Sequence, residues 1–157
     1  MQHPVPPSAL CASRVPGDTL LAEHVSHGVG VAAIDAARGV AGLLHVTEPD
    51  SKLDPADARQ HPGRFADTGV EQLLRKVVQL GGRPGKLTVK IAGVTQTGSK
   101  VHDDIARRNY AAVRKALWRA GAMIDAEDVG GDRERCLVVS VGDGAVLLKT
   151  DDQGRTL

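Results

Sequence analysis

Residues 25–46 read VSHGVGVAAIDAARGVAGLLHV, and this stretch decides the fold class. The segments 28–34 and 39–46 are short and rich in β-branched and small residues, a composition typical of strands. Turn-forming residues separate them, notably Asp35 and the pair Arg38-Gly39. The pattern therefore predicts two consecutive strands joined by a tight connection.

Similar patterns on either side extend this prediction to the whole chain. Apolar residues recur at helical spacing over residues 67–80 and 103–120, and glycines follow both segments. The turn Gly142-Asp143-Gly144 predicts a hairpin. Further strands are predicted over residues 19–25, 87–94, 122–127, 136–141 and 145–150. Strands at both ends with two main helices between them predict an α+β fold, a layered α/β sandwich with a mixed β-sheet.

The expected organisation is a single domain over residues 18–150. Residues 1–17 carry four prolines and are expected to form an irregular lead-in, with a short edge strand near residues 9–13. Residues 47–62 are expected to be a surface loop, and residues 151–157 a C-terminal tail.

Composition excludes several classes of protein. The 20 basic and 19 acidic side chains leave a net charge of +1, and aromatic residues make up only 2%. Neither a basic surface nor a stacking platform for nucleic acid is therefore indicated. No apolar run is long enough to span a membrane, and the N-terminus lacks a secretory pattern. With only two cysteines, a cytoplasmic protein is expected.

Two segments resemble phosphate-binding motifs but lack features that those motifs require. Residues 28–33 have the spacing G-x-G-x-x-A, but the preceding segment contains Glu23 and His24 and is a poor buried strand. Residues 93–100 resemble a P-loop, but Ser99 precedes Lys100, the reverse of the order that the loop requires. No cofactor is therefore expected.

The second predicted helix carries five basic residues and no acid after Asp104. This face could dock an acidic partner. Alternatively, it is a solvated face whose charges match the helix dipole, with acids at its start and bases at its end, and the dipole explanation is the simpler one.

Metal or nucleophilic chemistry has few candidates. His24, His27 and His45 could bind a metal, although no cysteine or carboxylate completes the set at a recognisable spacing. We therefore assign no metal ligand. Cys136 lies in an apolar strand, whereas Cys11 could be exposed and could act as a nucleophile with His45 as its base.

The ordered motifs of the chain resemble the CheD family of chemoreceptor glutamine deamidases. The resemblance covers about residues 18–150, and its more specific parts are I-x-x-R-N at 105–109 and A-E-D-x-G-G at 126–131. The other matching segments are 28–35, 39–46, 49–51, 64–68 and 90–93. The resemblance implies the layered fold of that family and a role in chemotaxis signal transduction.

The family reaction is hydrolysis of a protein glutamine by a cysteine, a histidine and an orienting threonine. Carried over by position, the histidine is His45, the cysteine position is occupied by Gly28, and the threonine position by Ala22. Two of the three side chains are therefore missing.

The resemblance thus implies a degenerate member, a pseudoenzyme that binds chemoreceptors or a CheC-type phosphatase. Ser26 and His27, beside the vacant position, are candidates for substrate binding or for moving into the vacated space. The alternatives are an active amidohydrolase that uses Cys11 or a water activated by His45, and a metal-binding protein built on His24, His27 and His45.

Overall fold

The computed structural model describes residues 1–157, which fold into two stacked five-stranded sheets with helices on one side. In sheet A, the strands are, in spatial order, β1 (Gln2–Pro4), β3 (Thr19–Val25), β8 (Arg135–Ser140), β9 (Val146–Thr150) and β10 (Gln153–Thr156). In sheet B they are β2 (Leu10–Ser13), β5 (Val40–Val46), β4 (Val29–Asp35), β6 (Thr88–Gly93) and β7 (Ile124–Val129).

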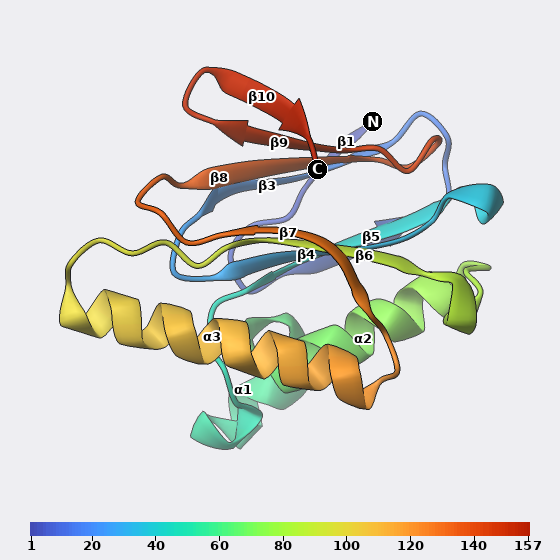
Figure 1. Ribbon diagram of the computed structural model, residues 1–157. Coiled ribbons are helices and arrows are strands. Elements are labelled where there is room, and N and C mark those ends of the chain that lie inside the picture. Colours follow the sequence, from blue (N-terminus) through green and yellow to red (C-terminus); the bar gives the residue numbers. More distant parts are fainter.

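Figure 1 shows three layers: sheet A, sheet B and the helices. Sheet A lies on one face of sheet B, and α2 (Ala66–Gln79) and α3 (Lys100–Arg119) cover the other face. Both sheets are mixed, because β1 runs parallel to β3 and β7 runs parallel to β6, whereas the remaining pairs are antiparallel. The predicted α+β layered sandwich with two main helices is confirmed.

Two apolar clusters hold the layers together. One fills the space between sheet B and the helices and includes Val31, Leu44 and Leu73. The other lies between the two sheets and includes Leu43 and Leu137. Every residue of β4 and β5 is buried because both faces of these strands are covered.

Local sequence explains where the long helices begin and end. The Asp103 carboxylate accepts hydrogen bonds from the backbone N–H groups of Thr97 and Gly98 and so fixes the start of α3. Gly81 and Gly121 follow the two helices with positive φ angles of 113° and 74°. This left-handed conformation ends a helix and favours glycine. None of the helices combines the length and the apolar character needed to span a membrane.

Three segments are more ordered than we expected. Residues 1–17 contain β1 as well as the expected edge strand β2, so this lead-in is only partly irregular. Pro4 is tolerated because β1 is an edge strand. Residues 151–157 contain β10, and the loop at 47–62 contains the short helix α1 (Pro55–Gln60), whose first turn is capped by Asp54.

Candidate functional site

His45 and Gly28 lie side by side at one end of sheet B. His45 is in β5 and pairs in register with Gly30 of β4, and Gly28 directly precedes β4. Leu43, two residues before His45, belongs to the cluster between the sheets, so His45 points toward sheet A as well. A Cβ atom built on Gly28 would lie 3.4 Å from Cδ2 of His45. The structure therefore brings together the two positions that the resemblance assigns to nucleophile and base.

The backbone leaves no room for a side chain at Gly28. A Cβ atom at this position would lie 2.3 Å from the carbonyl oxygen of Val46, well inside van der Waals contact. A larger residue would require the end of β5 to move, because the clashing atom belongs to the backbone.

The imidazole of His45 is buried and neutral. Its relative exposure is 2%, and its Nδ1 atom has no hydrogen-bond partner. The pKa of His45 is lowered to about 4, mainly by burial; the backbone of Val5 opposes this shift, and the nearby His27 contributes to it. A base with so low a pKa accepts protons poorly at neutral pH.

Ala22 and Cys11 do not complete a catalytic set with His45. Ala22 lies on β3, is fully buried in the cluster between the sheets and carries no hydroxyl that could orient an imidazole. Cys11 lies on β2 opposite Leu43, and its Sγ atom is 4.0 Å from the carbonyl oxygen of Ala12. Burial raises the pKa of Cys11, which disfavours the reactive thiolate.

A chain of polar side chains lies beside Gly28. The hydroxyl oxygens of Ser26 and Thr95 are 2.9 Å apart, and Thr95 Oγ1 is 3.0 Å from Nε2 of His102. The rings of His102 and His27 meet edge to face, with centroids 5.8 Å apart. Burial and the neighbouring His102 lower the pKa of His27. Ser26 and His27, both half-buried, thus sit in a polar network that also includes Thr95 and His102, which sequence reasoning did not identify.

Asn109 is a third residue that the sequence analysis missed as part of the site. Its Nδ2 group donates to the carbonyl oxygens of His27 and Thr47, at 3.1 Å each. It is fully buried, and its Oδ1 atom has no partner. Asn109 is a polar residue on the apolar face of α3, between Ile105 and Val113, and this position was the signal that could have revealed it.

The three histidines proposed as metal ligands do not converge. The side chain of His24 is 80% exposed, and its Nδ1 atom lies 3.0 Å from the carboxylate of Glu134. His45 is buried between the sheets. No three or more His, Cys, Asp or Glu side chains are grouped so that they could hold a metal ion. The geometry therefore gives the metal-binding alternative no support.

Comparison with known proteins identifies relatives along most of the chain. A family profile described as CheD chemotactic sensory transduction matches residues 49–150. A probable chemoreceptor glutamine deamidase CheD of Solibacter usitatus is 33% identical over 149 residues, covering 92% of this chain and 86% of the relative. Similar proteins from Anaeromyxobacter dehalogenans and Methanococcus maripaludis are 38% and 30% identical, each covering 82% of this chain, with 84% and 83% of the relatives covered.

Proposed function

Because the chain belongs to the CheD family, we propose that it acts in chemotaxis by binding chemoreceptors in the cytoplasm without deamidating their glutamine side chains. The observation that carries this proposal is Gly28. The position that would hold the nucleophile has no side chain, and the carbonyl oxygen of Val46 occupies the space where a Cβ atom would lie.

The chemistry of amide hydrolysis explains why a chain without a nucleophile at position 28 should not deamidate glutamine. In the family reaction a thiolate attacks the amide carbon, ammonia leaves, and water then hydrolyses the thioester. Gly28 can form no thioester, and loss of a nucleophile from such a unit typically lowers the rate on the order of a million-fold. His45 alone is a weak base, since its pKa is about 4.

The alternatives in which the chain is an active amidohydrolase depend on groups that are poorly suited to catalysis. Cys11 would need its thiolate, but burial raises its pKa, and no hydrogen bond joins it to His45. A water activated by His45 would need a stronger base than the buried imidazole provides. We therefore favour a protein that retains the family scaffold and binds without turnover, with a CheC-type phosphatase as a second proposed partner.

The decisive measurement is mass spectrometry of chemoreceptor signalling-domain peptides after incubation with the protein, scoring conversion of glutamine to glutamate. The Anaeromyxobacter relative is assayed beside it to establish that the peptides are competent substrates. We expect no conversion by the wild-type chain. Conversion would overturn the proposal, and the variants Cys11→Ala and His45→Ala would then locate the chemistry.

A Gly28→Cys, Ala22→Thr double variant tests whether the pocket can still support the family reaction. Because a side chain at position 28 must displace backbone, Gly28→Ala is measured by circular dichroism as a check on folding. Gly17→Ala is its matched control, since a Cβ at Gly17 meets no atom within 4 Å.

Pull-down with a chemoreceptor fragment and with a CheC-type phosphatase tests binding directly. Recovery of neither partner would contradict the binding role.

A further inference from the structure

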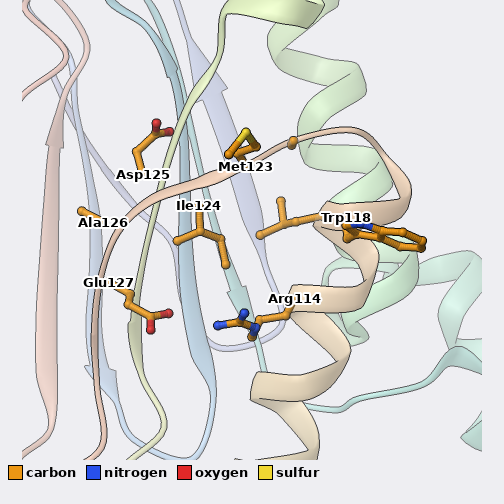
Figure 2. A pocket seen from close by; sticks show the side chains of 9 residues that line it. Arg114, Trp118, Met123, Ile124, Asp125, Ala126 and Glu127 are labelled. Carbon is orange, nitrogen blue, oxygen red and sulfur yellow. The ribbon is translucent and has the colours of Figure 1, made fainter.

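A groove lies between the end of α3 and β7, remote from the site around His45. Its volume is about 480 Å³, and six of its nine lining residues are hydrophobic. Leu117 of α3 and Ile124 of β7 are among its lining residues, and Trp118 and Met123 lie at its rim (Figure 2). β7 is the last strand of sheet B and pairs only with β6, so no strand covers the outer edge of the groove.

Large apolar side chains at this groove are exposed to solvent. Trp118 is 79% exposed and Met123 is 80% exposed. Figure 2 shows the indole of Trp118 pointing away from β7. Tryptophan, methionine and arginine are among the residue types enriched at protein interfaces.

The solvent face of α3 beside the groove is strongly basic. Arg108, Lys115 and Arg119 project from one face of the helix, because their spacings of seven and four residues return to the same side. All three are exposed, and none forms a salt bridge within the protein. The helix dipole accounts for basic residues in the last turn but not for Arg108 in the middle of the helix.

The acidic residues of the groove are already paired inside the protein. Glu127 accepts hydrogen bonds from the hydroxyl of Tyr110 at 2.9 and 3.0 Å, and that hydroxyl also accepts a bond from Arg114. Asp125 accepts a bond from the backbone N–H of Val89. The charged groups that remain free to contact a partner are therefore the basic side chains on the solvent face of α3.

From this combination we propose that the α3–β7 groove docks an acidic segment of a partner protein. The acidic residues of that segment face Arg108, Lys115 and Arg119, and a large apolar side chain enters the groove beside Trp118. A concave groove with an apolar floor suits a single side chain, whereas a membrane or a nucleic acid would require a broader surface of uniform charge.

The groove itself is separate from the candidate site. Sixteen residues of helix separate His102, which contacts Thr95, from Trp118 at the groove, a span of roughly 24 Å. Binding at the groove can therefore be measured without any chemoreceptor, and its failure would leave the proposed function at Gly28 and His45 untouched.

Fluorescence provides a direct test, because Trp118 is the only tryptophan in the chain. The probe is a synthetic helical peptide of Glu and Ala with one Leu, and the reference peptide carries Gln in place of every Glu. We expect the acidic peptide to shift the Trp118 emission and to bind at least about tenfold more tightly than the Gln peptide, a difference of about 1.4 kcal/mol. Equal binding of the two peptides, or no binding, would overturn the proposal.

Charge reversal at the groove provides the matched comparison. The triple variant Arg108→Glu, Lys115→Glu, Arg119→Glu should weaken binding of the acidic peptide at least about tenfold. A control triple variant, Arg14→Glu, Arg38→Glu, Arg59→Glu, changes net charge equally at exposed positions elsewhere and should bind normally. Equal weakening in both triples would overturn the proposal, because it would show a response to net charge alone.

Two further measurements test whether the charge-reversal variant folds and whether a different class of ligand binds at the groove. If circular dichroism shows that the Glu triple variant unfolds, the Gln versions of the same three positions replace it, with the same expected direction. Phosphatidylglycerol vesicles and duplex DNA are titrated in parallel. A shift of Trp118 emission with either of these and not with the acidic peptide would overturn the proposal in favour of that ligand.

Discussion

At the scale of single residues, His45 is the side chain that sequence and structure both single out. Its ring is almost fully buried, and its Nδ1 atom has no partner. A buried imidazole without a counter-charge is stable only in its neutral form. The fold therefore carries a group that must remain unprotonated.

His45 is expected to make the protein less stable in mild acid. In the unfolded chain His45 binds a proton below about pH 6.5, whereas in the folded protein it does so only near pH 4. The free energy of unfolding should therefore fall by about 2 kcal/mol between pH 7 and pH 5, and the loss should continue toward pH 4. Urea unfolding at a series of pH values measures this dependence.

Substitution of His45 by glutamine should reduce the dependence of the free energy of unfolding on pH between pH 7 and pH 4. His24→Gln serves as the control, because it also removes a histidine, one whose side chain is exposed on the surface. An unaltered slope in His45→Gln would show that other groups, such as the half-buried His27, produce the acid sensitivity.

At the scale of secondary structure elements, α3 connects the core to the site. Its buried face packs on sheet B through Ala106, Val113 and Leu117. On the same face Asn109 joins the carbonyl oxygens of His27 and Thr47, which lie beside Gly28 and just beyond β5. The helix thus fixes the two chain segments that border the candidate site.

Replacement of Asn109 by alanine should lower the free energy of unfolding by about 2 to 4 kcal/mol, because two backbone carbonyls lose their donor. Lys115→Ala, on the exposed face of the same helix, should change stability by less than about 0.5 kcal/mol. Chemical denaturation of the two variants makes the comparison. Similar small changes in both would show that the two hydrogen bonds of Asn109 contribute little to stability.

The elements themselves were largely predictable from the sequence. The strand at residues 19–25 was predicted with its observed bounds, and the two long helices were predicted to within about three residues at each end. These segments are set by local periodicity and by glycines that follow them. The short helix after Asp54 was missed, although an Asp-Pro pair is a helix-start signal.

The polar network of the site could not be predicted in the same way. Thr95 contacts Ser26 across 69 positions of sequence, and Asn109 reaches His27 across 82. Such contacts depend on which strands and helices become neighbours, and no local pattern specifies that. The adjacency of His45 and Gly28 was expected only from the resemblance to the CheD family.

At the scale of the whole molecule, the first residues of the chain link the two sheets. β1 joins sheet A, and β2 joins sheet B. Val5, between them, is 1% exposed. The N-terminal amine of Met1 and the ring of His3 both contact the carboxylate of Asp18, at 3.3 and 2.7 Å. The segment is therefore part of the folded core.

Deletion of residues 1–5 should lower the free energy of unfolding by about 3 kcal/mol, from the lost burial of Val5 and the lost partners of Asp18. For a chain of this size the melting temperature should fall by roughly 6 to 12 °C. Deletion of residues 153–157 is the matched control and should have the smaller effect, since every residue of β10 is exposed and, of the deleted residues, only Leu157 packs against a core cluster. Differential scanning calorimetry measures both, and equal losses would contradict a structural role for β1.

The pairing of β3 with β8 has a consequence for synthesis on the ribosome. Val25 pairs with Arg135, which lies 110 positions later in the sequence. At about 5 to 20 residues per second, translation takes roughly 5 to 20 seconds to cover that distance. A nascent chain that has just completed β7 already contains every strand of sheet B and both long helices, while β3 still lacks its antiparallel neighbour. During that interval the edge of β3 that later pairs with β8 has unpaired backbone N–H and C=O groups, which can pair with strands of other nascent chains.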